Sequence, residues 1–148
     1  MASKTILVVD DEQGYVEPLR DALEFGGYRV LTARSAEEAL RVAAEMRIDL
    51  ATVDIMMPPG ESLESSVASH EAGLYVCKEL RRKYPSLDLF CISVVTDERV
   101  IREVKALGIR FLRKGETPLR TVLEMLESRL TGVAYSTVKP NKWGRTKP

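Results

Sequence analysis

Three consecutive carboxylates follow directly on an apolar run near the start of the chain. The run covers residues 6–9, and the acids are Asp10, Asp11 and Glu12. Adjacent acids repel one another, so crowding them is costly unless they face solvent, a cation or basic partners. The pattern therefore indicates a cation site. The other interpretation is a solvated turn whose acids lie at the N-terminus of a helix, where negative charge is favourable.

Further reactive side chains lie where later apolar runs end. These are Asp54, Lys114 and a hydroxyl that is either Ser93 or Thr96. Carboxylate oxygens are ligands that Mg²⁺ prefers, and Mg²⁺ keeps open positions for a phosphate. An aspartate beside Mg²⁺ can attack a phosphoryl donor and become an acyl phosphate. Because that reaction also needs a cation and a hydroxyl donor for the phosphate oxygens, these residue types together indicate phosphoryl transfer to an aspartate.

The elements that must position these groups alternate between strands and helices. The predicted strands cover residues 6–9, 28–33, 50–53, 87–94 and 109–112, and the predicted helices cover residues 14–25, 36–46, 74–83, 98–107 and 118–130. Such alternation implies an α/β fold, a parallel sheet with helices on both faces. Because ligands bind beyond the carboxyl ends of such strands, we expect the acids at 10–12 to converge with Asp54.

Local signals set several helix ends. Ser35 and Glu38 form a capping box, and Thr117 is predicted as an N-cap with Pro118 at the first helical position. Pro18 is tolerable only in the first turn of its helix, because proline lacks the N–H that later turns use.

Composition favours one globular domain with a basic tail. The 148 residues are 45% hydrophobic and 30% charged, which are globular values. Residues 1–130 hold 22 acidic and 18 basic residues, a net charge of −4, whereas residues 131–148 hold four basic residues and no acid. We predict one domain over 1–130, and a tail or linker stub over 131–148 with Trp143 as its anchor candidate.

The cysteines and the N-terminus bear on the compartment. Cys77 and Cys91 have no metal-ligand spacing and lie in apolar patterns, which suits a reducing compartment. No apolar run approaches the length of a membrane span, and the start of the chain lacks a signal-peptide pattern. We therefore expect a cytoplasmic protein without a membrane partner.

Residues 4–130 resemble the receiver domains of two-component response regulators, of the CheY-like kind. The matching marks are Val9-Asp10-Asp11-Glu12, Asp54 with Met57-Pro58, Ser93, and Phe111-Leu112-Arg113-Lys114. The resemblance implies a (βα)5 flavodoxin-like three-layer sandwich with the parallel strands in the order 2-1-3-4-5.

The same resemblance implies a role for each acid. Asp54 is expected to be the phospho-acceptor. Asp11, Asp54 and the backbone carbonyl of Met56 are expected to hold Mg²⁺, with Asp10 binding the metal through water. Glu12 is expected to cap the helix that follows and not to bind the metal.

On the side of the site that faces these acids, the resemblance implies that Lys114 pairs with the phosphoryl group. Ser93 would be the switch hydroxyl, and Phe111 the aromatic side chain that swings inward with it. The phosphoryl donor would be a histidine kinase or phosphotransfer protein, and the chain's own chemistry would be limited to self-phosphorylation and slow autodephosphorylation. The output would be binding to another protein through the surface of the fourth helix, fifth strand and fifth helix, since no effector domain follows residue 130. A homodimer is possible, and binding to nucleic acid is not expected.

The sequence departs from the family pattern at three places. Lys114 precedes Gly115 where most receivers have proline, and Ser93 precedes Val94 where alanine is usual, which could crowd the phosphoryl pocket. Gly73 takes the place of the glycine that opens the third helix, so residues 60–72 are an insertion beside the site. The insertion is either a lid or partner-specific loop or a tolerated surface insertion. Its only histidine, His70, is either a proton donor or pH sensor or simply an exposed side chain.

These departures keep rival functions open. A receiver that acts without phosphorylation, as a constitutive interaction module, would explain Val94, Gly115 and the insertion, but a domain freed of metal has no reason to hold three acids together. A flavodoxin-like electron carrier would need a phosphate-cradling loop after the first strand, and an aspartate-nucleophile phosphatase would need an Asp-x-Asp arrangement there. The sequence carries neither.

Overall fold

The computed structural model describes residues 3–133, and the predicted tail from residue 134, with Trp143, lies outside them. The strands are Thr5–Val9 (β1), Arg29–Ala33 (β2), Leu50–Val53 (β3), Asp88–Ser93 (β4) and Arg110–Arg113 (β5). The helices are Gln13–Phe25 (α1), Ala36–Glu45 (α2), Ala72–Lys83 (α3), Glu98–Ala106 (α4) and Leu119–Thr131 (α5), with a short 3-10 helix at Ser69–Glu71 (η1).

The five strands form one parallel sheet in the order β2-β1-β3-β4-β5, which confirms the predicted fold. Val9 at the end of β1 pairs with Val53 at the end of β3. The residue after each is an aspartate. The register therefore sets Asp10 beside Asp54 at the carboxyl edge of the sheet.

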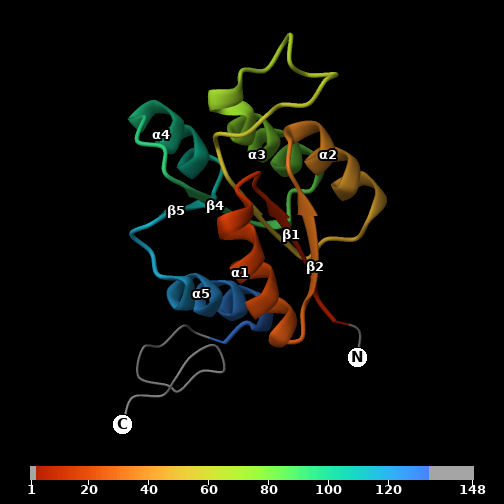
Figure 1. The fold of residues 1–148 in the computed structure, drawn as a ribbon, viewed down its shortest axis with the longest axis vertical. Helices are drawn as coiled ribbons and strands as arrows, with labels where there is room; N and C mark the ends of the chain where they lie inside the picture. The colour runs from red at the N-terminus through yellow and green to blue at the C-terminus, as the bar shows by residue number, and fades with distance from the viewer. Residues whose placement is uncertain (1–2, 134–148) are drawn as a thin grey trace.

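Two layers of helices cover the sheet (Figure 1), and the alternation of side chains along β1 explains why. Leu7 and Val9 pack into a core cluster shared with α2, α3 and α4, whereas Ile6 and Val8 pack into a second cluster shared with α1 and α5. All four side chains are buried, as a strand covered on both faces requires. The predicted three-layer sandwich is confirmed.

Two predictions about helix starts are wrong. Pro18 is the sixth residue of α1 and not part of its first turn. The helix tolerates it because Pro18 and Gly14, whose carbonyl loses its partner, are both exposed, so water can reach that carbonyl. The N-cap of α5 is Pro118 and not Thr117, since Pro118 keeps an extended ψ of 151°.

The capping box before α2 is present in a modified form. The Glu38 N–H donates to the Ser35 hydroxyl at 3.1 Å, as predicted. The Glu38 carboxylate reaches one residue further back and accepts the N–H of Arg34 at 2.8 Å. Both side chains thus satisfy backbone donors at the start of α2.

Both cysteines, Cys77 in α3 and Cys91 in β4, are free and buried. Within residues 3–133, no helix combines the length and apolar character needed to cross a bilayer.

Candidate functional site

Three carboxylates meet at the carboxyl edge of the sheet. The chain leaves β1 with the Asp10 N–H bonded to Ala33 O, and leaves β3 with the Asp54 N–H bonded to Val9 O, both at 2.9 Å. These bonds carry the ladder one residue past each strand and hold both aspartates in place. One ligand oxygen each from Asp10, Asp11 and Asp54 lies within 4.8 Å of the others. The predicted convergence of these acids is confirmed.

Asp54 is held from behind by a glycine. The Gly73 N–H donates to Ile55 O at 2.8 Å, which draws the start of α3 onto the loop after β3. A Cβ built on Gly73 would lie 2.0 Å from the carbonyl oxygen of Asp54, so only glycine fits this approach. The glycine that opens α3 is therefore part of the support for Asp54.

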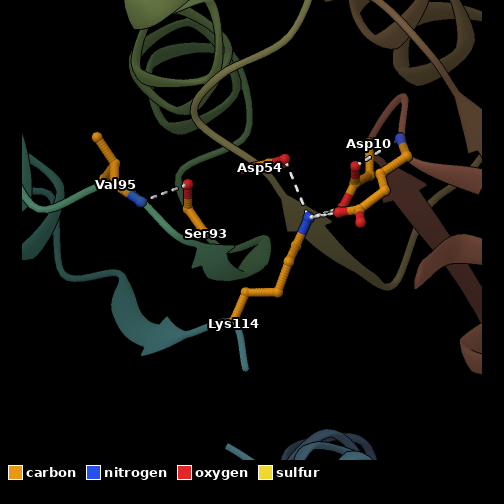
Figure 2. Close-up of polar contacts among 6 residues, drawn as sticks. Asp10, Asp54, Ser93, Val95 and Lys114 are labelled. Carbon is orange, nitrogen blue, oxygen red and sulfur yellow. Dashed lines mark hydrogen bonds and ion pairs between the residues drawn. The ribbon is translucent and has the colours of Figure 1, made fainter. Parts of the chain in front are cut away.

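Lys114 bridges the acids from β5 (Figure 2). Its N–H donates to Ser93 O at 2.9 Å, which extends the pairing of β4 and β5. Its Nζ lies 2.8 Å from Asp10 Oδ2, 2.9 Å from Glu12 Oε1 and 3.1 Å from Asp54 Oδ2. The side chains of Lys114, Asp10 and Asp54 are at most 8% exposed, so these two charge-assisted contacts are shielded from solvent, whereas the Glu12 side chain is 61% exposed.

Burial and charge shift the ionisation of this cluster. Burial, and to a lesser extent the charge of Asp54, raises the pKa of Asp10 to about 6 against the lowering effect of Lys114 and the Glu12 N–H. Burial alone would lower the pKa of Lys114, but its hydrogen bonds to Asp10 and Glu12 and the charge of Asp54 raise it above the usual value. Lys114 is therefore cationic at neutral pH, while Asp10 is poised to bind a proton in mildly acidic solution.

The residues present fit a divalent cation. When ionised, the four acids at this edge carry three more negative charges than Lys114 can balance, and like charges so close together need a counter-charge. Asp54 Oδ1 is buried and makes no hydrogen bond to any described residue. A buried carboxylate oxygen without a partner, close to Asp10 and Asp11, is a ready ligand for a hard cation.

Comparison with known proteins decides the family. The model of the response regulator receiver domain matches residues 6–125. The chain belongs to this family. The family resemblance predicted above is confirmed.

A transcriptional regulatory protein that is longer than this chain is among the relatives of this receiver domain. The chain is 35% identical over 96 residues to the alkaline phosphatase synthesis transcriptional regulatory protein PhoP of Bacillus subtilis, a match that covers 65% of this chain and 35% of PhoP. It thus spans about a third of the length of that relative.

Among solved structures, a CheY-like receiver domain protein from Methanospirillum hungatei has a TM-score of 0.76 at 22% identity, with 88% of this chain and 96% of that chain covered. A response regulator from Burkholderia pseudomallei, solved with a phosphorylated aspartic acid, calcium ion and citrate, has a TM-score of 0.69 at 22% identity, with 88% and 71% covered. At these identities the likeness shows the fold.

The two residues predicted to form the switch lie on the β4–β5 side of this receiver. Ser93 is fully buried, and its hydroxyl accepts the Val95 N–H at 3.3 Å, as Figure 2 shows. Phe111 is partly buried and packs against the core cluster on the α2, α3 and α4 side. Thr96, the competing hydroxyl, is exposed. The switch roles of Ser93 and Phe111 stay predictions.

The structure shows the conformation of Gly115 and the exposure of Val94, the two residues beside the site that differ from the family pattern. Gly115 has φ of 89°, a left-handed conformation that glycine adopts without strain, so the backbone turns directly after Lys114. Val94 is 59% exposed, and Met56, whose carbonyl is a predicted metal ligand, also presents its side chain to solvent. Two apolar side chains are thus accessible in the loops that leave β3 and β4.

The insertion extends beyond the start of α3 (Figure 1) and is tied to α2. The first N–H groups of α2, those of Ala36 and Glu37, donate to the carbonyls of Pro58 and Pro59 at 3.1 and 2.8 Å. The carboxylate of Glu37 in turn accepts the N–H of Ser62 at 3.1 Å. The loop after Asp54 therefore caps α2 and is anchored by it.

The carboxyl end of the insertion is tied to α4. Glu71 Oε2 lies 2.7 Å from Arg99 Nη2, and Arg99 also pairs with Glu103 in the next turn. Lys78 of α3 joins the same network at 2.7 Å from Glu103. His70 has a 67% exposed side chain, as its second interpretation expects. Whether the insertion acts as a lid or partner loop stays a prediction.

Two neighbours of Lys114 were not predicted from the sequence. Glu12 is the N-cap residue of α1, as predicted, but its side chain makes no capping hydrogen bond and contacts Lys114 instead. The Tyr15 ring centroid lies 4.7 Å from Lys114 Nζ. For Glu12, the only sequence signal for a contact with Lys114 is the need of three adjacent acids for a basic partner. For Tyr15, no sequence signal indicates a contact with Lys114.

Proposed function

We propose that Asp54 is the phospho-acceptor of this receiver domain. One observation carries the proposal: Asp54 is buried, with one carboxylate oxygen at 3.1 Å from Lys114 Nζ and the other without a hydrogen-bond partner among residues 3–133. A nucleophile needs a free oxygen, and the product needs a cation beside it.

The phosphoryl transfer uses residues of this chain in distinct roles. The free Asp54 oxygen attacks phosphorus and forms an O–P bond, while the P–N bond of a phosphohistidine breaks and its electron pair leaves with the imidazole. Lys114 Nζ exchanges its contact with Asp54 for one with a phosphoryl oxygen. Ser93 donates its hydroxyl hydrogen to another, since its oxygen accepts the Val95 N–H and its own hydrogen is left to donate.

We infer that Mg²⁺ is the cation of this site. Asp11, Asp54 and the carbonyl of Met56 would hold it directly, and Asp10 would bind it through water. When bound, the ion supplies positive charge between the carboxylates and the phosphoryl oxygens. The excess of acids over Lys114 supports this assignment.

The output we propose is a change of the α4–β5–α5 face that alters binding to a protein partner. Ser93 follows the phosphoryl group, and Phe111 moves inward as Ser93 moves, which shifts the population toward the active surface. The phosphoryl source would be a histidine kinase or phosphotransfer protein.

The receiver unit we propose spans residues 1–130 with an insertion at 60–72; the predicted tail from residue 134 on lies outside the described residues. A cytoplasmic location is supported by Cys77 and Cys91, two free thiols in the core that suit a reducing compartment.

Beryllofluoride with Mg²⁺, a mimic of the phosphorylated state, tests this function. We expect amide NMR signals of the wild-type chain to shift at the strand ends and across α4, β5 and α5. The matched control is Asp54→Asn, which keeps the shape of the side chain but loses its charge, and its spectrum should not respond. An unchanged wild-type spectrum would contradict the proposal.

A further inference from the structure

The Lys114 ammonium also contacts a residue outside the acid cluster. Its Nζ is 4.7 Å from the ring centroid of Tyr15, within reach of cation–π attraction. Tyr15 is the third residue of α1 and packs against the apolar cluster shared with α5. The ammonium therefore has an aromatic partner fixed to the core in addition to its three carboxylates.

These partners differ in what happens when the site is loaded. A divalent cation on the acids competes with Lys114 for Asp10 and Asp54, and it repels the ammonium at short range. The Tyr15 ring is neutral and offers a hard cation no ligand oxygen from its face. The contact between Tyr15 and Lys114 can therefore persist while the contacts with carboxylates are exchanged.

The backbone fixes where the Lys114 side chain begins, because the Lys114 N–H donates to Ser93 O at 2.9 Å, but it does not set the direction of the long side chain. Gly115 follows with φ of 89°, and a Cβ built there would meet no atom within 4 Å. The orientation of the ammonium therefore comes from the contacts of Lys114 Nζ with the carboxylates and with the Tyr15 ring.

We infer that Tyr15 is a positioning residue that keeps the Lys114 ammonium directed at Asp54 while the phosphoryl group is transferred. This inference rests on the proposed function of Asp54. The aromatic face is the acting part, because the Tyr15 hydroxyl is buried and makes no hydrogen bond to any described residue.

Two substitutions separate the ring from the hydroxyl. Tyr15→Phe keeps the face and removes an unpaired polar atom, so the initial rate of phosphorylation by acetyl phosphate with Mg²⁺ should stay within about twofold of wild type. Tyr15→Leu keeps apolar bulk and removes the face, so the rate should fall by about two- to thirtyfold. The rates are measured on the full chain by phosphate-affinity electrophoresis.

A double-mutant cycle tests whether Tyr15 acts through Lys114. In a Lys114→Ala background, adding Tyr15→Leu should change the rate no further, whereas a purely structural effect would add to the loss. Tyr28→Leu is the matched control, since Tyr28 packs against the same cluster beyond the other end of α1, and its rate should equal that of wild type.

A spectroscopic measurement covers the case in which Tyr15→Leu does not fold. Ring current from Tyr15 should shift the Lys114 ε-methylene protons upfield in the wild-type chain, and the shift should remain with beryllofluoride and Mg²⁺. Loss of that shift in the loaded state, a wild-type rate for Tyr15→Leu, or equal slowing by Tyr15→Phe would overturn the inference. A wild-type chain that takes up no phosphate would instead contradict the proposed function, and the inference with it.

Discussion

Replacing Gly73 with alanine should destabilise the fold and displace the phospho-acceptor, because the new methyl group has no room. It would lie 2.0 Å from Asp54 O and 2.4 Å from Ile55 Cα. Both are backbone atoms, so relief requires a shift of α3 or of the loop that carries Asp54. The same change at Gly14 is a matched control, since Gly14 is also the second residue of its helix and has no atom within 4 Å of an added Cβ.

The magnitude follows from the difference between the two sites. Alanine improves helix propensity at both, by up to about 0.5–1 kcal/mol. Only Gly73→Ala adds the cost of overpacking, typically about 1–3 kcal/mol. The free energies of unfolding of the two variants should therefore differ by about 1–3 kcal/mol, with Gly73→Ala less stable than wild type and Gly14→Ala at least as stable. For a chain of this size, each kcal/mol corresponds to roughly 2–4 °C in melting temperature.

Urea unfolding followed by far-UV circular dichroism measures this difference. The rate of phosphorylation by acetyl phosphate should fall in Gly73→Ala and stay unchanged in Gly14→Ala, because only the former moves Asp54. Equal stability of the two variants would refute the close approach of α3 to Asp54.

Three other measurements address ionisation, capping and burial. Burial raises the pKa of Asp10 from 3.8 to about 6, so the stability it contributes to the metal-free chain is lost as the pH rises through about 6, whereas Mg²⁺ needs the ionised carboxylate. The increase in melting temperature on adding Mg²⁺ should therefore grow between about pH 5 and pH 7, the range that spans this pKa. An increase that does not depend on pH would contradict the role of Asp10. Ser35→Ala removes the acceptor of the Glu38 N–H and should cost about 1 kcal/mol in urea unfolding; no loss would show that the cap is dispensable. Burial raises the pKa of Cys77 to about 12 and that of Cys91 well above its usual value, so iodoacetamide should modify them only after unfolding, and rapid labelling of the native chain would be inconsistent with their burial.

The fold was predictable because the strands are apolar runs with sharp ends. The predicted strand at 50–53 matches β3, and the other four differ from the structure by about one residue at either end. Parallel strands place their carboxyl ends at one edge. That rule predicted that Asp10 and Asp11 would meet Asp54, whereas the place of Lys114 beside them was implied by the family resemblance.

The supporting contacts were not predictable because they depend on packing between distant segments. Glu12 has the same sequence context as a capping acid, and only the position of β5 shows that it faces Lys114. Tyr15 has ordinary helical spacing, which fits a core residue equally well. Pro18 was misplaced because its tolerance depends on solvent reaching the carbonyl of Gly14.

The insertion shows the same limit. Its composition of small and polar residues is typical of a solvent-exposed loop. The structure nevertheless ties it to α2 through Glu37 and to α4 through Glu71 and Arg99. No local pattern indicates those partners, since the hydrogen bond between Ser62 and Glu37 and the ion pair between Glu71 and Arg99 each join residues far apart in the chain.

The most direct test of the account is to find where phosphate is incorporated. The wild-type chain is incubated with acetyl phosphate and Mg²⁺, treated with borohydride to convert an acyl phosphate to homoserine, and digested for mass spectrometry. The account predicts a single modified residue at position 54 in the wild-type chain, and no modification in Asp54→Asn or when Mg²⁺ is removed by a chelator. Modification at another residue, or a wild-type chain that remains unmodified, would contradict it.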